Sequence, residues 1–210
     1  MAKRAYNFNE LSKILDDEYQ WRRRELFLFK SKIPTEPSSL QKAYLRAGIA
    51  MLYAHIEGFV KNTSTFYLQF ISYKYLKHNE LKSHLIALCL KNKFNTANNI
   101  EKQSELIDFV INDLGQKANL PYKNIINTRS NLNYQVFEDV IFTIGINKSG
   151  FERREEILND LVELRNTIAH GEYKDIDYET FNGFYDEVDS LMGDYKTEIE
   201  NNALLDKYKK

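Results

Sequence analysis

One stretch near the C-terminus specifies a helix and then breaks its own pattern. Its apolar residues recur at i, i+4, i+7 and i+11, the spacing of one helical face: Ile157, Leu161, Leu164 and Ile168. Arg165 lies in the neighbouring apolar row, beside Val162 and Ala169. An unpaired cation is too costly to keep inside a core. We therefore expect a core-facing helix whose guanidinium has a partner.

The same helix ends in a histidine followed by a glycine, His170 and Gly171. Five residues of α-helix turn through about 500°, which leaves Arg165 and His170 roughly 140° apart. They meet only if the chain turns back at Gly171 or if a second copy contributes across a dyad. Asn166 is four residues before His170 on the same face, and we expect it to orient the imidazole.

The remaining chain has helical patterns separated by short breaks, with only three prolines and eight glycines. We predict an all-α fold, an up-and-down helical bundle in one domain that spans residues 1–210. Its core covers about 40–200, with a helix and linker over 1–38. Residues 201–210 form a polar tail that we expect to fray.

The formal net charge is −1, so no overall basic field draws the chain onto nucleic acid. One basic run, Arg22–Arg24, stands beside Trp21. It could bind RNA, but we favour a solvated helix face with charges paired to nearby acids: Asp16, Asp17 and Glu25.

The single cysteine and the hydropathy pattern limit the cellular compartment and the kinds of partner that we expect. Cys89 is the single cysteine, so we expect no disulfide partner, no cysteine-based metal site and no cofactor. Met1–Arg4 leads into no apolar signal segment, and no run reaches the roughly 18 apolar residues of a membrane helix. We expect a cytoplasmic protein without a membrane partner.

A second group of polar residues shares a face of the helix predicted between 40 and 77. Arg46, Tyr53 and Glu57 are seven and four residues apart. Small residues recur nearby and predict a closely crossing helix: Ala47, Ala50, Ala54 and Gly58. Glu57 is either a functional carboxylate at that crossing or half of a surface salt bridge with Arg46 or Lys61.

An arginine and a histidine without a carboxylate cluster suit the cleavage of a phosphodiester without a metal. An imidazole can exchange a proton with a 2′-hydroxyl or a leaving oxygen, and a guanidinium can hold the phosphate as its charge grows. The predicted substrate is RNA.

The stretch Arg165–His170 resembles the motif of the HEPN superfamily of helical ribonucleases: arginine, a polar residue, three variable residues and histidine. Further segments resemble a prokaryotic HEPN-like nuclease branch found among defence genes: Leu52–Phe59, Asn131–Asn133 and His170–Glu172. The likeness covers most of the chain from about Leu40 to Tyr173.

This resemblance implies a homodimer in which two copies of the motif helix meet, and metal-independent cleavage of RNA that leaves a 2′,3′-cyclic phosphate. It assigns Arg165 and His170 to the catalytic pair and Asn166 to the assisting position. It also implies a role in anti-phage defence or as a toxin, with an antitoxin or other defence protein as partner. Glu57, Arg46, Tyr53 and Tyr173 are candidates for supporting the site or binding substrate.

One departure concerns Tyr173, which follows His170 by three residues. A toxin branch of the superfamily has its tyrosine two residues after the histidine. The chemistry of that tyrosine and the nucleotidyltransferase antitoxin of that branch are therefore not carried over.

Two alternatives compete with the enzyme. The first is a non-catalytic HEPN dimer that binds RNA, a nucleotide or a partner protein. The second is a purely structural bundle whose Arg165 stabilises a dimer through Glu57 or Glu163.

Overall fold

A computed structural model describes residues 4–210; Met1–Lys3, where the sequence predicts no signal segment, lie outside this range. Within it the chain forms α-helices and short 3-10 helices, and no β-strand. The prediction of an all-α fold is confirmed. The α-helices are α1 (Phe8–Lys30), α2 (Ser39–Ser72), α3 (Ser83–Thr96), α4 (Ile100–Asn112), α5 (Tyr134–Ile144), α6 (Glu155–Ala169) and α7 (Tyr178–Leu204). The 3-10 helices span His78–Glu80, Lys148–Gly150 and Glu152–Arg154.

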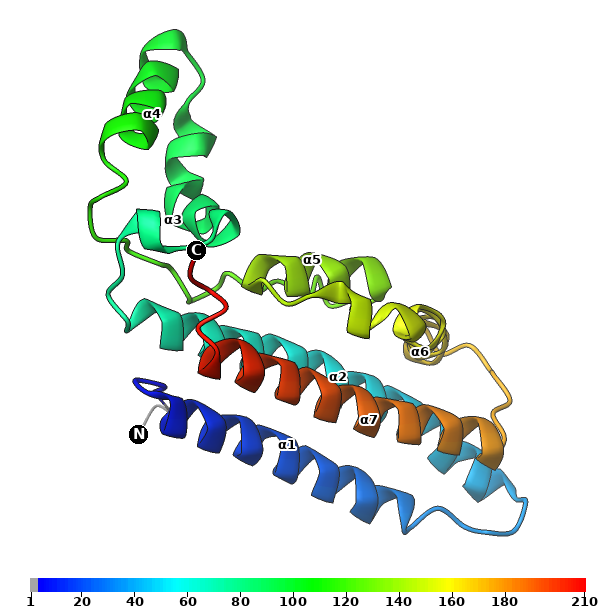
Figure 1. Cartoon of the computed structure of the whole chain (residues 1–210). Coiled ribbons are helices and arrows are strands. Elements are labelled where there is room, and N and C mark those ends of the chain that lie inside the picture. Colours follow the sequence, from blue (N-terminus) through cyan, green and yellow to red (C-terminus); the bar gives the residue numbers. More distant parts are fainter. Residues whose placement is uncertain (1–3) are drawn as a thin grey trace.

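The central element is α2, which packs against α1, α7, α5 and α6. The three long helices α1, α2 and α7 lie side by side, and α1 runs opposite to the other two (Figure 1). Helix α6 is seen along its axis in that view, so it lies across the long helices. This crossing brings the motif helix onto the middle of α2.

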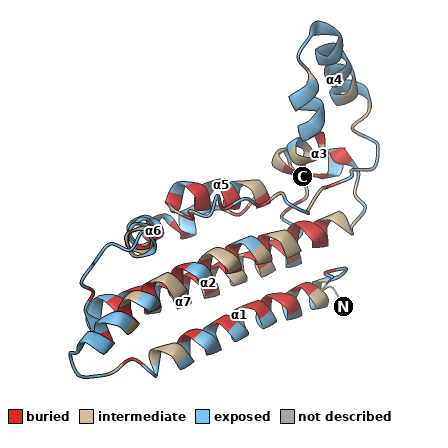
Figure 2. Cartoon of the chain, turned by 180° about the vertical axis from the view of Figure 1, so that it is seen from behind, coloured by how far each residue is buried: buried red, intermediate tan, exposed pale blue. Residues whose placement is uncertain are grey.

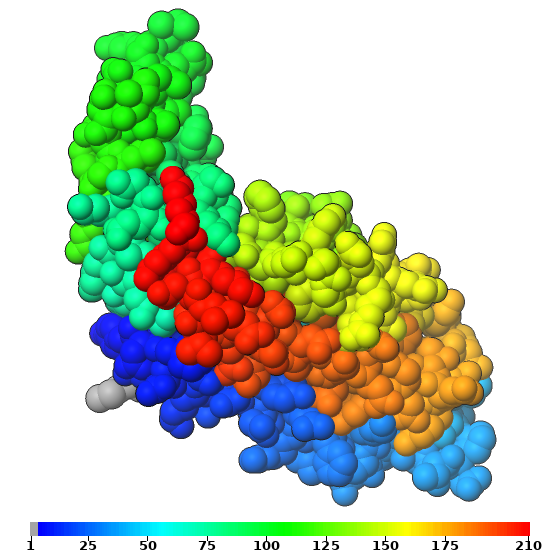
Figure 3. All heavy atoms as spheres, viewed as in Figure 1, coloured from blue at the N-terminus to red at the C-terminus, as the bar shows by residue number. Residues whose placement is uncertain are grey.

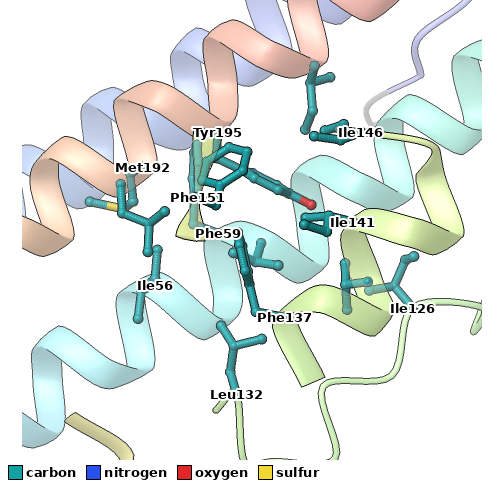
Figure 4. Packing of buried hydrophobic residues seen from close by; sticks show 14 of the residues in the cluster. Ile56, Phe59, Ile126, Leu132, Phe137, Ile141, Ile146, Phe151, Met192 and Tyr195 are labelled. Carbon is teal, nitrogen blue, oxygen red and sulfur yellow. The ribbon is translucent and has the colours of Figure 1, made fainter. Parts of the chain in front are cut away.

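An aromatic cluster joins α2, α5 and α7 at the centre of the core (Figure 4). The rings of Phe137 and Phe151 are 5.4 Å apart, and both contact Tyr195 of α7. The Tyr195 hydroxyl pairs with that of Ser64 at 2.6 Å, because a buried phenol needs a hydrogen-bond partner. Burial also raises the pKa of Tyr195 above its usual range. This cluster holds α5 and the start of α6 on the long helices.

The apolar face predicted for α6 is only partly buried. Leu158, Leu161 and Val162 are buried, whereas Leu164 and Ile168 near the C-terminal end are half-buried. Helix α6 therefore leaves the core as it approaches the predicted site. Its last turns are accessible to a substrate or a partner.

Helices α3 and α4 form a hairpin that projects from the body of the protein (Figure 1). Helix α4 has no buried residue, and its pale-blue surface stands out when the chain is coloured by burial (Figure 2). The hairpin lies at the end of the molecule remote from the linker between α6 and α7. Its helix α3 packs against α5, and the ring of His84 lies 6.4 Å from that of Phe142.

The prediction that the C-terminal tail frays is wrong. Tyr208 is 2% exposed, and its ring meets that of Phe70 edge-on at 6.0 Å. Its carbonyl accepts a hydrogen bond from the N–H of Lys82, and Lys210 donates to the carbonyl of Glu80. The tail lies over the start of α3 (Figure 3). One aromatic residue among charged neighbours is enough to dock it.

The close helix crossing predicted at the small residues of α2 is not formed along the whole row. Ala47 and Ala54 are exposed, whereas Gly58 lies under α1. A Cβ added to Gly58 would be 3.2 Å from Nη2 of Arg22. Gly58 thus makes room for a side chain of α1 and not for a crossing backbone.

The expectation that the basic run is a solvated face is wrong for Arg22, which is 3% exposed. Its Nη1 donates to Oε2 of Glu18 at 2.6 Å, and its Nε donates to the carbonyl of His55 at 3.2 Å. Its guanidinium also stacks on Trp21, 4.3 Å from the ring centroid. Arg23 pairs with Asp189 of α7 and not with a neighbour in the sequence. The run therefore ties α1 to α2 and α7.

Removing this buried cation should weaken the fold strongly. In Arg22→Ala the Glu18 carboxylate, itself 7% exposed, loses its ion pair with the Arg22 guanidinium. Breaking a buried ion pair costs about 3–5 kcal/mol, so we expect a loss of stability of that order. Urea unfolding followed by circular dichroism measures it. The matched control is Arg24→Ala on the same helix, where the exposed side chain should change stability by less than about 0.5 kcal/mol; equal losses in both variants would contradict the account.

Candidate functional site

The end of α6 is built by a left-handed glycine. Gly171 has φ of +78°, and its N–H donates to the carbonyl of Ile168 at 3.1 Å. The N–H of Glu172 reaches back to the carbonyl of Thr167, also at 3.1 Å. These two bonds form a Schellman motif, which stops the helix at His170. The imidazole is thereby held at a fixed helix end.

His170 differs from the other histidines in its exposure. His55 and His78 are buried and His84 is half-buried, whereas His170 is exposed. Burial lowers the pKa values of His55 and His84, which disfavours their charged forms. Among the four, only the side chain of His170 is open to a substrate.

A groove of about 390 Å³ runs beside His170, between α6 and the start of α5. Asn166 and His170 both line it, one turn apart, in agreement with the shared face predicted from their spacing. Arg165 does not line it. The other lining residues are Asn133, Asn159, Val162, Glu163, Thr167 and Glu172.

Arg165 points to a different place, against α2 and the loop that precedes α5. Its guanidinium lies over the ring of Tyr53 at 3.9 Å. Its Nη2 donates to the carbonyl of Ser130 at 2.6 Å, and its Nε is buried without a hydrogen bond among the described residues. The partner that the sequence predicted for this charge is thus an aromatic face and a carbonyl. It is neither Glu57 nor Glu163.

The loop over residues 127–133 is held by the same face of α2. The Tyr53 hydroxyl accepts a hydrogen bond from the N–H of Leu132 at 2.8 Å, and Thr128 donates to Glu57 at 2.7 Å. Arg129 and Ser130 have φ of +55° and +50°, a left-handed conformation that is strained for residues other than glycine. The contacts to α2 and to Arg165 maintain this conformation.

These contacts define what Glu57 and Tyr53 do in the fold. The Glu57 carboxylate binds the Thr128 hydroxyl, so it is not half of a surface salt bridge with Arg46 or Lys61. Burial raises the pKa of Tyr53, while the N–H of Leu132 and the charge of Arg165 oppose that rise. Tyr53 is therefore a neutral acceptor for the loop.

Asn166 does not orient the imidazole through its side chain. Its Nδ2 makes a long contact of 3.5 Å to Oδ1 of Asn131, and its carbonyl accepts the backbone N–H of His170 at 2.9 Å. The prediction was right about the shared face and wrong about the partner. The reason is that Asn131, from the loop before α5, lies within reach of α6.

Arg46 of α2 forms a separate pair with Tyr173, which lies on the segment that follows α6. The guanidinium of Arg46 lies 5.4 Å from the ring centroid of Tyr173, which is 67% exposed. Lys42 of α2 pairs with Asp175 on the same segment. These contacts fasten the linker to α2, and neither Arg46 nor Tyr173 lines the groove.

The sequence reasoning missed much of the groove lining. Asn133, Asn159, Glu163 and Glu172 were not proposed as site residues, although three residues of α6 share one face with His170. The three- and four-residue steps from Asn159 to Glu163, Asn166 and His170 could have revealed this polar row. Asn133 comes from the N-terminus of α5, so only the tertiary structure places it here.

Other reactive groups do not mark a second centre. Burial raises the pKa of the Cys89 thiol to about 11, so it remains protonated at neutral pH. Within residues 4–210 no three His, Cys, Asp or Glu side chains gather in a cluster that could hold a metal ion. No helix of that range has the length and apolar character needed to cross a membrane.

A comparison with known protein families identifies the family of the chain. The model of the HEPN family described as RiboL-PSP-HEPN matches residues 17–201. The chain therefore belongs to this HEPN family, whose all-α fold it has. Membership fits a nuclease or RNA-binding role in general. No curated protein and no solved structure matches the chain.

The Tyr53 hydroxyl should be needed to hold the loop beside Arg165. In Tyr53→Phe the ring still faces Arg165, but the N–H of the buried Leu132 loses its acceptor. An unsatisfied buried donor costs about 1–3 kcal/mol, and we expect that loss of stability together with faster amide exchange over residues 127–133. Tyr173→Phe, at an exposed tyrosine, is the control. Unchanged exchange in Tyr53→Phe would show that the loop does not depend on this bond.

Proposed function

We propose that the protein is a metal-independent endoribonuclease that acts as a homodimer. His170 and Arg165 form the catalytic pair, and Asn166 assists in the groove. Arg46, Tyr53, Glu57 and Tyr173 support the surrounding segments. The resemblance to a defence-associated HEPN branch supports a role in anti-phage defence or as a toxin.

The observation that carries the proposal is the exposure of His170 at a rigid helix end, in a groove that it shares with Asn166. An imidazole changes charge near neutral pH, which suits it to proton transfer. A structural histidine has no need to stand free at the rim of a groove. Membership of a HEPN family supports the same role.

The reaction needs one proton carrier and one phosphate-binding cation. His170 takes the proton of a 2′-hydroxyl, and the freed oxygen forms a bond to phosphorus while the bond from phosphorus to the 5′-oxygen breaks. His170 then returns the proton to that departing oxygen. The guanidinium stabilises the charge that builds up on the phosphate. The products carry a 2′,3′-cyclic phosphate and a 5′-hydroxyl.

The two groups do not share the groove of one chain, because Arg165 lies on Tyr53 and Ser130 while His170 lines the groove. A two-fold dimer solves this problem: the Arg165 of one copy meets the groove of the other. Nη2 of Arg165 donates to the carbonyl of Ser130, and Nη1 is the other terminal donor of the guanidinium. This Nη1 is the group that we assign to the phosphate.

Replacing His170 should abolish cleavage without affecting the fold. Because the side chain is exposed, His170→Ala should unfold like the wild type, while its rate of RNA cleavage in EDTA falls at least about 100-fold. Sequencing of RNA ends, with a test for cyclic phosphates, measures the products. Asp160→Ala, at an exposed position of α6 outside the groove, is the control. Cleavage that persists in His170→Ala would refute the assignment.

A heterodimer of two variants distinguishes a site shared between two chains from a site within one chain. Arg165→Ala and His170→Ala chains are co-expressed with different tags and purified as the mixed dimer. If Arg165 acts on the groove of its partner, one of the two sites is intact, and about half of the wild-type activity returns. Both parent homodimers should be inactive. A mixed dimer as inactive as its parents would place both groups in one chain.

A second function is the non-catalytic scaffold, and the charge of the groove favours the form of it that binds a partner protein. Glu163 and Glu172 line it with His170, and carboxylates repel a phosphodiester. A dimer that only binds RNA, a nucleotide or a partner protein would retain ligand in the assay above and never yield cyclic phosphate ends. The same experiment therefore decides between the two functions.

A further inference from the structure

Two amide side chains in the groove have a fixed orientation. Oδ1 of Asn133 accepts the N–H of Val136 at 2.9 Å, and Oδ1 of Asn159 accepts the N–H of Tyr134 at 3.0 Å. A backbone N–H requires an acceptor, so neither amide can be reversed. The amino groups of both side chains make no hydrogen bond to another residue within 4–210. Both side chains lie in the wall of the groove, which they also share with an adjacent pocket lined by Tyr134, Gln135 and Glu138, so their amino groups are available as donors there.

Acceptors stand beside these donors along α6. Glu163 lies one turn after Asn159, and its carboxylate forms no ion pair within the described residues. Asn166 stands one turn further on; its amino group faces Asn131, and its Oδ1 accepts no hydrogen bond from residues 4–210. Donors and acceptors thus stand together along the turns of α6 between Asn159 and His170.

This pattern fits the edge of a nucleobase better than a phosphate. The carboxylates of Glu163 and Glu172 repel a phosphodiester but accept hydrogen bonds from the N–H groups of a base. The RNA backbone then passes the rim of the groove at His170, and a base points inward. Single-stranded RNA is commonly read in this way, on the Watson–Crick edges of splayed bases.

We propose that the groove selects a keto base, guanine or uracil, in the nucleotide beside the cleaved bond. Both bases present a ring N–H next to a carbonyl. The Glu163 carboxylate accepts the ring N–H, and the amino groups of Asn133 and Asn159 donate to the carbonyl. This inference rests on the proposed nuclease function and names the substrate of the same site.

Adenine and cytosine fit this arrangement poorly. Each has an amino group where the keto bases have a carbonyl, and a ring nitrogen lone pair where they have an N–H. The amino group would meet the two amide donors, and the lone pair would meet a carboxylate. Glu163 and His170 are seven residues apart, about 10 Å along α6, so the base lies near the reacting phosphate.

The first experiment uses DNA oligonucleotides that contain one ribonucleotide, so that a single bond can be cleaved. The base on each side of that bond is varied through all four possibilities. We expect cleavage about tenfold faster or more with guanine or uracil on one side, as for a well-paired base contact. Methylation of the ring nitrogen, in 1-methylguanosine or 3-methyluridine, should remove the advantage. Equal rates for all four bases, or a preference for adenine and cytosine, would overturn the proposal.

Two matched variants test whether the preference for keto bases depends on the groove. Asn133→Asp retains the acceptor for the N–H of Val136 but replaces the free amino donor by an oxygen. The keto preference should fall about tenfold, with overall stability maintained. Asn7→Asp makes the same change at the N-cap of α1, where Asn7 accepts the N–H of Glu10, and should leave the preference unaltered. An unchanged preference in Asn133→Asp would contradict the role of this amide.

A binding measurement separates this inference from the proposed function. Fluorescence anisotropy is measured with fully 2′-deoxy versions of the same oligonucleotides, which cannot be cleaved. Tighter binding of keto bases without any cleavage of the ribonucleotide substrates would refute the nuclease and retain the base selectivity. Cleavage without base selectivity would retain the nuclease and refute the base selectivity.

Discussion

The site depends on the contacts of the Arg165 guanidinium, because these contacts join three segments that are distant in the sequence. The guanidinium stands on α6, lies over Tyr53 of α2 and donates to the carbonyl of Ser130 before α5. Tyr53 in turn accepts the N–H of Leu132. The loop is thereby held in its left-handed conformation, and the N-terminus of α5 is placed beside α6. The bond from the N–H of Tyr134 to Oδ1 of Asn159 also holds this N-terminus on α6.

The sequence predicts those features that depend on local geometry. The steps of three and four residues predict α6, Gly171 predicts its end, and helical rotation predicts that Arg165 and His170 diverge. The structure agrees on each point, since Arg165 does not line the groove. The arrangement of the two catalytic candidates in a dimer follows from the same rotation, and it stays a prediction. Local spacing was therefore sufficient to find the motif and to exclude a simple site on one helix.

The features that were missed depend on contacts between distant segments. Arg22 is buried because α1 lies on α2 at Gly58, and nothing in the basic run itself indicates this. Tyr208 is buried because the start of α3 lies within reach of the tail. Asn133 enters the groove because the loop before α5 is fastened to α2. A sequence read segment by segment cannot supply such information, since the partner residues are from 33 to more than 100 positions away.

The distribution of charge around α6 also has a consequence for how RNA could be held. Carboxylates lie on the groove side of the helix, at Glu163 and Glu172, and the guanidinium of Arg165 lies on the other side. A phosphodiester is repelled by the first and attracted by the second, whereas a base can donate to carboxylates. Under the proposed function, an RNA strand would therefore bind between the groove of one copy and an Arg165 that faces it. The proposed two-fold dimer would supply this arrangement twice, so the polarity of α6 and the proposed composite site follow from one constraint.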